Sequence, residues 1–465
     1  MRTLAEPFRY SVVLGAVALL VAAIPASPAY ADEAWDMCTN EDPDIGIAGC
    51  DEVLSRGDAE SDRNRAIAYR NRGLAYQAKD NLDAAIADYV EAISLDPGYV
   101  TAFNDLGIAY RNKDDIERAI GAYSDAIRLD PDYAYAYNNR GNAYRDRGDF
   151  DLAIADYSDA IRLDPAYVFA YNGRGNAFQD KGELDRAIAD YDMAIRLDPD
   201  YQATFYGRGN AHRDLGNVDL AIADYTESIR LDPSYAAAYN GRGNAHRDLG
   251  NVDLAIADYA RAIELEPRYV FAFNGRANAY AAIGETERAI ADYDLAIRFD
   301  PNYAIAYRNR GLAFDDLGQT DRALEDYDAA IRLNPAYAYA YNDRGIIYDN
   351  RGMPERAVEE YSRALEIDPN YTFAYNNRGV AYQNMGEMEL AIADYEAALA
   401  LEPDYERAQE NLEQALSEMG DGGFRAAGAS RSQSGGAPQA DRATTRTFYG
   451  EGTGGGPDIW VLIEP

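Results

Sequence analysis

The chain has 465 residues, with 44 Lys and Arg against 80 Asp and Glu, which gives a formal net charge of −36 at pH 7. So acidic a chain is not expected to bind nucleic acid, because phosphate binding needs a basic surface. Apolar residues make up 47% of the chain, a globular balance that excludes a wholly disordered protein despite the net charge.

The first 31 residues have the pattern of a targeting segment. Arg2 and Arg9 flank its start, residues 11–24 form an almost unbroken apolar run, and residues 29–31 read Ala-Tyr-Ala. This order of basic, apolar and small residues is typical of a secretory signal peptide, which we expect over residues 1–31 with cleavage before Asp32. No later apolar stretch is long enough to span a membrane, so no span is expected in the mature chain.

The two cysteines, Cys38 and Cys50, favour a disulfide bond. In an exported chain an even pair of cysteines is more often bridged than free, and the C-x-x-C spacing typical of redox sites is absent. A bridge that closes a loop of this size stabilises by about 3 kcal/mol in the chain-entropy account. The residues before Cys50 also resemble a lipoprotein cleavage box, but an acidic stretch separates them from the apolar run, so lipid anchoring is not expected.

A strict period of 34 residues organises most of the chain. Ten prolines recur at this spacing without an insertion: Pro97, Pro131, Pro165, Pro199, Pro233, Pro267, Pro301, Pro335, Pro369 and Pro403. They define ten units over residues 66–405. In each unit one apolar pattern of helical spacing runs to a break that contains Gly, and a second runs to the proline. Each unit is therefore predicted to be a helical hairpin.

Small residues recur at two positions of the units. Glycine occupies the first position at Gly73, Gly107, Gly141, Gly175, Gly209, Gly243, Gly311, Gly345 and Gly379, with Ala277 as the exception. Alanine occupies the second at Ala85, Ala119, Ala153, Ala187, Ala221, Ala255, Ala289, Ala323, Ala357 and Ala391. Such residues let two helices approach closely. Bulky side chains fill the remaining space, which accounts for 39 Tyr beside 13 Phe and 2 Trp.

These positions carry a family resemblance. The residues that match are Tyr137, Gly141, Tyr144, Ala153, Tyr157, Ala160 and Pro165, at the spacings of the tetratricopeptide repeat (TPR), and the match recurs through all ten units. The resemblance implies an all-α fold, a right-handed TPR superhelical solenoid of antiparallel helix hairpins. It also implies a concave groove lined by the first helix of each hairpin.

One departure from the family pattern is regular. Where many members carry Leu, this chain has arginine at Arg72, Arg140, Arg174, Arg208, Arg242, Arg276, Arg310, Arg344 and Arg378, and only Leu106 is apolar. A buried or bridging arginine needs acidic partners. We expect these residues to pair with acids of neighbouring helices, such as Asp156 or Asp190, and not to form a ligand site.

Both ends of the repeat array are expected to be capped, because the end of a solenoid needs a polar cover. Residues 32–65 resemble a degenerate N-terminal capping hairpin, held by the expected disulfide, and residues 406–419 read as one amphipathic capping helix. Residues 420–465 form a tail rich in Gly and Ser that ends in an apolar segment around Trp460. The tail is expected to be flexible, and its end is either a disordered remnant or a docking peptide.

No catalytic constellation emerges from the sequence, and neither an enzyme nor a cofactor nor a metal site is expected. His212 and His246 occupy a position that holds Tyr144 in another unit, so they are predicted to be core residues. A zinc site would need further ligands nearby, and neither cysteine is close in sequence. The Gly-rich residues 452–456 lack the Lys-Ser/Thr of a phosphate loop.

Paired asparagines mark the predicted groove. The candidate partner-binding residues are Asn138, Asn142, Asn172, Asn176, Asn210, Asn240, Asn244, Asn274 and Asn278. Within a pair the spacing of four places both amides on one face of the first helix. Such a row of amides could hydrogen-bond the backbone of an extended segment without demanding a particular side chain, or it could merely keep the groove hydrated.

The sequence therefore favours a non-enzymatic scaffold for protein–protein interaction in the cell envelope, with an extended protein segment in its groove. Resemblance to exported bacterial TPR proteins implies a periplasmic location, with secretion as the alternative. The alternative function is an accessory subunit of a polysaccharide synthesis or export assembly. A protein or peptide partner is expected, and neither its identity nor the oligomeric state follows from the residues.

Overall fold

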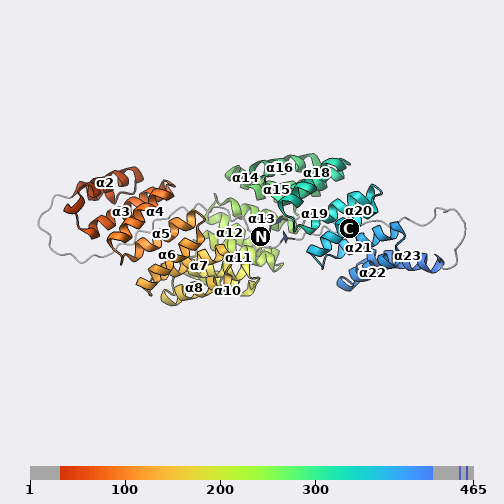
Figure 1. The fold of residues 1–465 in the computed structure, drawn as a ribbon, viewed down its shortest axis with the longest axis horizontal. Helices are drawn as coiled ribbons and strands as arrows, with labels where there is room; N and C mark the ends of the chain where they lie inside the picture. The colour runs from red at the N-terminus through yellow and green to blue at the C-terminus, as the bar shows by residue number, and fades with distance from the viewer. Residues whose placement is uncertain (1–31, 423–449, 452–456, 459–465) are drawn as a thin grey trace. The chain divides into compact units, whose positions relative to one another are not determined.

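A computed structural model describes residues 32–422, 450–451 and 457–458. These residues are almost entirely helical, and they divide into two compact units, one ending at Leu215 and one beginning at Gly216 (Figure 1). The predicted signal peptide and most of the predicted tail lie outside the described residues.

The N-terminal unit consists of eleven α-helices and a short 3-10 helix, η1 (Gly57–Ala59). The α-helices are α1 (Glu33–Cys38), α2 (Pro43–Ser55), α3 (Asp62–Ala78), α4 (Leu82–Leu95), α5 (Val100–Asn112), α6 (Ile116–Leu129), α7 (Ala134–Arg147), α8 (Phe150–Leu163), α9 (Val168–Asp180), α10 (Leu184–Leu197) and α11 (Gln202–Asp214).

The C-terminal unit continues the same alternation of helices. It contains α12 (Val218–Leu231), α13 (Ala236–Asp248), α14 (Val252–Leu265), α15 (Val270–Ala282), α16 (Thr286–Phe299), α17 (Ala304–Asp316), α18 (Thr320–Leu333), α19 (Ala338–Asn350), α20 (Pro354–Ile367), α21 (Thr372–Met385), α22 (Met388–Leu401) and α23 (Glu406–Gly422). Two short strands, β1 (Gly450–Glu451) and β2 (Pro457–Asp458), pair antiparallel, and the backbone of β1 lies near α15.

The predicted all-α fold of stacked helix hairpins is confirmed. Each 34-residue period between residues 66 and 405 holds two helices, and within each unit consecutive helices pack against each other in chain order. We number these hairpins as repeats 1 to 10. Most of the hairpin turns use a glycine with positive φ, such as Gly148 at 88°. In repeats 1 and 2, Asp80 and Asp114 adopt this left-handed conformation instead, at 59° and 61°.

Ten tyrosines form the centre of the packing, one on the second helix of each repeat. All are almost completely buried: Tyr89, Tyr123, Tyr157, Tyr191, Tyr225, Tyr259, Tyr293, Tyr327, Tyr361 and Tyr395. The first small position lies against this ring, since a Cβ added to Gly141 would lie 2.9 Å from Cε1 of Tyr157. The glycine is therefore needed for the close approach of the two helices, as the sequence predicts.

Two glycines of repeat 2 provide a matched test of this packing. A Cβ on Gly107 would lie 2.5 Å from Cε1 of Tyr123, whereas a Cβ on the helical Gly121 would meet nothing within 4 Å. Gly107→Ala is expected to destabilise by about 1–3 kcal/mol through overpacking. Gly121→Ala is expected to stabilise by roughly 0.5–1 kcal/mol through helix propensity. Urea unfolding of the two variants measures both changes, and equal effects would contradict the packing account.

Arginines pair with acids of neighbouring helices, as the sequence predicts, and several of them also contact the preceding repeat. Arg140 donates two hydrogen bonds to Asp156, at 2.7 and 2.8 Å, and a third to Oγ of Ser124 on α6 at 3.0 Å. The Asp156 side chain is only 7% exposed, and burial raises the pKa of its carboxyl group. Arg174 makes the same contacts with Asp190. The arginines are thus structural bridges between helices.

Repeat 2 replaces the whole bridge by apolar or small residues. Leu106 occupies the position of Arg140. Val90, 16 residues earlier, corresponds to Ser124, and Ala122, 16 residues later, corresponds to Asp156. Leu106 and Ala122 belong to one hydrophobic cluster. The arginine and its two partners have therefore changed together, which is expected if they form one unit of packing.

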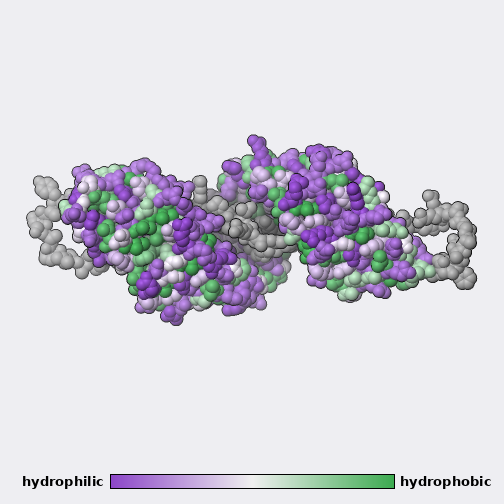
Figure 2. All heavy atoms as spheres, in the orientation of Figure 1, coloured by the Kyte–Doolittle hydropathy of each residue, from purple (hydrophilic) through white to green (hydrophobic). Residues whose placement is uncertain are grey.

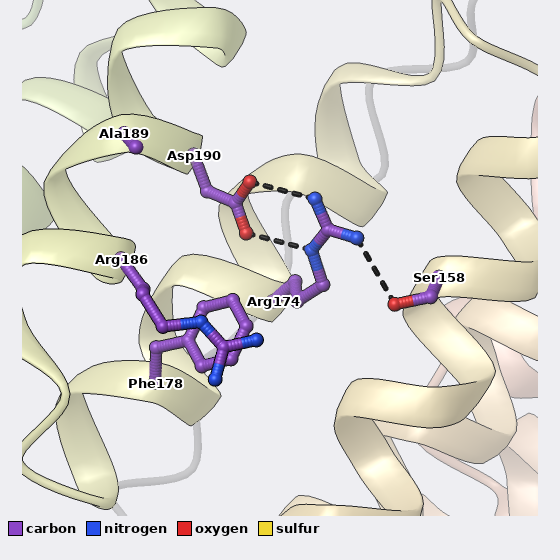
Figure 3. Close-up of a pocket in the computed structure, with 6 residues that line it drawn as sticks. All are labelled: Ser158, Arg174, Phe178, Arg186, Ala189 and Asp190. Carbon is purple, nitrogen blue, oxygen red and sulfur yellow. Dashed lines mark hydrogen bonds and ion pairs between the residues drawn. The ribbon is translucent and has the colours of Figure 1, made fainter.

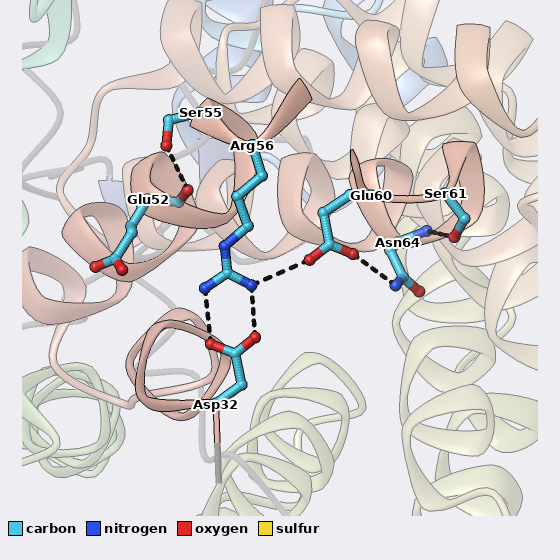
Figure 4. Close-up of polar contacts among 7 residues, drawn as sticks. All are labelled: Asp32, Glu52, Ser55, Arg56, Glu60, Ser61 and Asn64. Atoms are coloured by element: carbon cyan, nitrogen blue, oxygen red, sulfur yellow. Dashed lines mark hydrogen bonds and ion pairs between the residues drawn. The ribbon is translucent and has the colours of Figure 1, made fainter. Parts of the chain in front are cut away.

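The segment predicted to cap the N-terminal end begins with a small hairpin of α1 and α2. Cys38 and Cys50 form the predicted disulfide bond between these helices. Arg56 joins Asp32 to Glu60, and Oγ of Ser61 accepts from the backbone N–H of Asn64 at the start of α3 (Figure 4). Because α3 begins at Asp62, the first repeat helix starts four residues before the predicted boundary at residue 66.

The segment predicted to cap the C-terminal end forms the helix α23, which extends three residues past the predicted end at residue 419. Its Asn411 donates to Oδ1 of Asn376 on α21 at 2.8 Å, so this helix docks on the last repeat. None of the helices within residues 32–422 is long and apolar enough to cross a membrane.

Candidate functional site

The first helices of consecutive repeats contact one another in both units, for example α5 with α7 and α13 with α15. Among the described helices, the second helices of consecutive repeats do not contact one another to a comparable extent. Within each unit the first helices therefore lie closer together than the second helices, which places them on the inner side of a curved stack. We call this surface of each unit its inner face.

All nine predicted asparagines lie on these first helices. Asn138, Asn142, Asn172, Asn176 and Asn210 belong to α7, α9 and α11 of the N-terminal unit, and Asn240, Asn244, Asn274 and Asn278 belong to α13 and α15 of the C-terminal unit. The structure thus brings each set together within its own unit.

Polar side chains connect successive first helices across the inner face. A first row joins residues 35 apart in the chain: Asn104 with Asn139, Asn274 with Asn309, Asn342 with Asn377, Asn376 with Asn411, Arg70 with Asp105 and Arg308 with Asp343. We call each of these pairs a rung. Burial raises the pKa of Asp105 although Arg70 donates to its carboxylate.

A second row of rungs lies about two turns closer to the C-terminal ends of the first helices, seven residues after the first row. Arg111 donates to Asp146 and Arg145 to Asp180, both at 2.5 Å, and Gln179 donates to Asp214 at 2.8 Å. The mixed charge of this row is thus largely paired within the protein. The sequence analysis did not predict the rungs. The signal that could have found them is the recurrence of a hydrogen-bond donor and an acceptor at a spacing of 35 residues, which is one repeat plus one residue.

The second asparagine of each predicted pair has a structural role. Oδ1 of Asn142 accepts from the hydroxyl of Tyr157 at 2.7 Å. The same bond joins Asn176 to Tyr191, Asn244 to Tyr259 and Asn278 to Tyr293. These amides therefore satisfy the hydroxyl groups of buried tyrosines, and only their Nδ2 groups remain for a ligand.

In several pairs the side-chain oxygen of the first asparagine, unlike that of the second, accepts no hydrogen bond from the described residues. The Oδ1 atoms of Asn138, Asn172 and Asn240 are buried and accept no hydrogen bond from the described residues. In each case the residue 35 positions later, where other repeats have Asn or Asp, is glycine: Gly173, Gly207 and Gly275. The rung is missing there because its second side chain is missing.

Exposed aromatic rings border this part of the inner face. Tyr135 is 51% exposed and Phe169 is 54% exposed. They form a continuous row with Tyr133, Tyr167 and Tyr201, with ring centroids between 5.1 and 5.9 Å apart; the Tyr133–Tyr135 contact is tilted and the other contacts are edge-to-face. Hydrophobic residues also appear as small patches among hydrophilic ones on the face drawn in Figure 2. The row offers apolar surface beside the asparagine amides.

The two histidines lie on first helices, His212 on α11 and His246 on α13. His246 lies on α13, with Nε2 3.9 Å from Asp258, and burial lowers its pKa, so the ring is neutral at pH 7. Among residues 32–422 no group of three or more His, Cys, Asp or Glu could hold a metal ion.

A shallow pocket of about 230 Å³ lies on α8, α9 and α10 (Figure 3). Its charged groups are already paired, because Arg174 bonds both Asp190 and Ser158. Arg186 stacks over the ring of Phe178 with its guanidinium carbon 3.8 Å from the ring centroid, and it also pairs with Glu183. The pocket is therefore part of the bridge between repeats, and it offers no free group for chemistry.

Comparison with known proteins agrees with this geometry. A family profile described as TPR repeat matches residues 108–145, 141–182, 175–216 and 277–318. Two profiles described as Tetratricopeptide repeat match residues 206–270 and 308–372, and residues 66–99 and 372–405. Stacked helical hairpins of this kind define a repeat solenoid, a class of protein that typically serves as a scaffold for protein partners. The chain belongs to the tetratricopeptide repeat family.

Similar solved structures include a chain of the APC/C hetero-tetramer Cut9–Hcn1, with 16% identity and a TM-score of 0.50, over 83% of this chain and 87% of that chain. Another is a tetratricopeptide repeat protein from Parabacteroides merdae, with 22% identity and a TM-score of 0.43, over 50% of this chain and 93% of that chain. The first similarity shows the fold alone. Among curated proteins no sequence matches the chain.

Proposed function

We propose that the protein is a non-enzymatic scaffold of the cell envelope that holds an extended segment of a partner protein on its inner face. Membership of the TPR family supports a protein partner. The observation that carries the proposal is the row of exposed aromatic rings at Tyr135 and Phe169, next to asparagine amides on the same helices. Aromatic surface beside adaptable amides is typical of sites that bind peptides.

An exported location is part of this proposal. Its support is the basic, apolar and small-residue order of residues 1–31, together with the disulfide bond between Cys38 and Cys50, since such bonds persist in oxidising compartments. Asp32, the first residue expected after cleavage, pairs with Arg56. Amino-terminal sequencing of the exported protein should begin at Asp32, and a cytosolic protein with residues 1–31 intact would contradict export.

Site-specific photo-crosslinking tests the proposed surface. A photoreactive phenylalanine analogue replaces Tyr135 or Phe169 on the inner face, and as a control it replaces Leu152 on the second helix α8, which is 48% exposed. We expect the inner-face positions to crosslink a common protein in envelope extract and Leu152 to give none of it. Equal crosslinking at all three positions would contradict binding on the inner face. If the crosslinked protein belongs to polysaccharide synthesis or export, the protein serves that assembly.

A further inference from the structure

The residue at the end of the first helix changes in kind along the repeats. In repeats 1 to 4 and in repeat 9 it is a cation: Lys79, Lys113, Arg147, Lys181 and Arg351. In repeats 6 to 8, which belong to the C-terminal unit, the same position holds Leu249, Ile283 and Leu317. These three residues are 46%, 46% and 38% exposed. Three consecutive hairpin turns thus present a large apolar side chain to solvent.

The cations at this position join consecutive repeats. Arg147 in repeat 3 pairs with Glu117, the second residue of α6 in repeat 2, at 2.8 Å. In the C-terminal unit Arg351 pairs in the same way with Asp321, the second residue of α18, at 2.7 Å. Both pairs join residues 30 apart in the chain. The position therefore lies beside the start of the preceding second helix, and a cation fits there in both units.

The acid of this pair is present even where the cation is not. Thirty residues before the three apolar residues lie exposed acids, each the second residue of a second helix: Asp219, Asp253 and Glu287. The helix dipole favours a carboxylate in the first turn, which accounts for these acids. By the equivalence of the repeats, each apolar side chain lies beside an acid whose usual cation it replaces. We call these six residues the turn edge of the C-terminal unit.

The fold does not account for the apolar residues of the turn edge. Single exposed apolar residues are common on protein surfaces, whereas these three recur at one position in consecutive repeats. A cation there would add an ion pair to the neighbouring repeat, as Arg351 does. Ile283 and Leu317 differ in type, and the turns around them read Ala-Ile-Gly-Glu and Asp-Leu-Gly-Gln, so they are not copies of one turn. The apolar character recurs where the residue type does not, which points to a partner.

The spacing of the turn edge fits an α-helix. The first helices of consecutive repeats contact each other, as α15 and α17 do. Packed helices lie about 8–10 Å apart, so equivalent turns are separated by about 10 Å. Seven residues of an α-helix rise by about 10 Å. A helix with one apolar residue at every seventh position can therefore contact Leu249, Ile283 and Leu317 in turn.

The acids determine the charge of such a helix. Asp219, Asp253 and Glu287 lie beside the apolar residues, so Lys or Arg next to the apolar positions of the helix complements them. A second copy of this chain is a poor occupant, because it would bring acids against acids in a protein of net charge −36. The complementary partner is thus an amphipathic helix with a basic rim.

We infer that the turn edge of the C-terminal unit binds a basic amphipathic helix of another protein. The apolar residues of that helix pack on Leu249, Ile283 and Leu317, and its Lys and Arg side chains pair with the three acids. This surface lies at the hairpin turns and not on the inner face, so the inference does not rest on the proposed function.

A display library tests the chemistry of the partner. Peptides of 21 residues carry three Leu fixed at a spacing of seven, with every other position random, and they are panned on the purified protein. We expect enriched peptides to carry Lys or Arg next to the fixed Leu. A library that yields no enriched peptide, or enriched peptides without an excess of basic residues, would overturn the inference.

A triple variant tests the location of the surface. Leu249→Lys/Ile283→Lys/Leu317→Lys copies the turns of repeats 1, 2 and 4. In fluorescence polarisation it should bind the enriched peptides at least tenfold more weakly than the wild type. Its melting temperature should be unchanged or higher, because each Lys can pair with the acid beside it. Wild-type affinity in this variant would place the peptides elsewhere and overturn the turn edge as their site.

A second triple variant controls for the change in charge. It replaces by Lys three leucines of the same unit that are exposed to a similar extent, at 38%, 41% and 46%, and that lie away from the turn edge: Leu333, Leu401 and Leu416. Its affinity should stay within twofold of the wild type, and an equal loss in both variants would reduce the effect to general charge. Sedimentation at several concentrations tests the second copy. Self-association of the wild type that the first variant abolishes would replace the partner helix by another copy of this chain. Crosslinking on the inner face is unaffected by either result.

Discussion

Asp156→Ala is expected to destabilise repeat 3 by about 3–5 kcal/mol, because it leaves the guanidinium group of Arg140 buried without its counter-ion. The Arg140 side chain is 18% exposed, and Asp156 accepts two of its hydrogen bonds. Urea unfolding followed by circular dichroism measures the loss. Since the repeats stack through nearest-neighbour contacts, the loss should appear as earlier unfolding around α7 and α8.

Substitutions that copy repeat 2 are expected to restore the stability of this variant. Arg140→Leu and Ser124→Val, added to Asp156→Ala, reproduce the set Leu106, Val90 and Ala122. The triple variant should unfold within roughly 1 kcal/mol of the wild type, because replacing a buried ion pair by apolar residues is often neutral or stabilising. A triple variant as unstable as Asp156→Ala would show that the three positions do not act as one unit.

The second large effect is expected at alkaline pH. Burial raises the pKa of Tyr89, Tyr123, Tyr191, Tyr293, Tyr327, Tyr361 and Tyr395 far above the ordinary value. Burial also raises the pKa of Tyr133 and Tyr337 to about 12. In the unfolded chain these groups lose their proton near pH 10, whereas in the folded chain they keep it.

The unfolded state therefore binds fewer protons above about pH 10, and stability falls as the pH rises from there. Each of these tyrosines contributes up to about 1.4 kcal/mol of this loss per pH unit until its folded pKa is reached. We expect the buried tyrosinates to appear, by absorbance near 295 nm, only together with the loss of helical circular dichroism. Below about pH 9 the tyrosines should leave stability unchanged.

Two controls separate tyrosine burial from general charge repulsion. High salt screens the repulsion expected from a net charge of −36 but leaves the burial effect in place. Tyr361→Phe removes a buried hydroxyl that forms no hydrogen bond with any described residue, so it should be neutral at pH 7 and should raise the pH at which unfolding occurs. Titration of all tyrosines near pH 10 with the helices intact would contradict the expectation.

The hairpin repeat followed from the residues alone because its determinants are local. Helical periodicity, a glycine such as Gly148 in the turn and a proline after the second helix recur in almost every period, and these features act within one hairpin. The pairing of Arg140 with Asp156 could also be predicted, since a buried guanidinium needs an acid and the repeat supplies one at a constant spacing. The disulfide followed from the parity of the cysteines.

The two asparagines of each pair could not be told apart from the sequence. Asn138 and Asn142 are the same residue type on the same face of one helix, and their difference depends on groups of other helices. Tyr157 supplies a hydroxyl to Asn142 from α8, whereas Gly173 supplies nothing to Asn138 from α9. Local spacing therefore determined the hairpins and their stacking, and only the tertiary structure decided which amides are engaged, because hydrogen-bond partners on separate helices meet only after the repeats have packed.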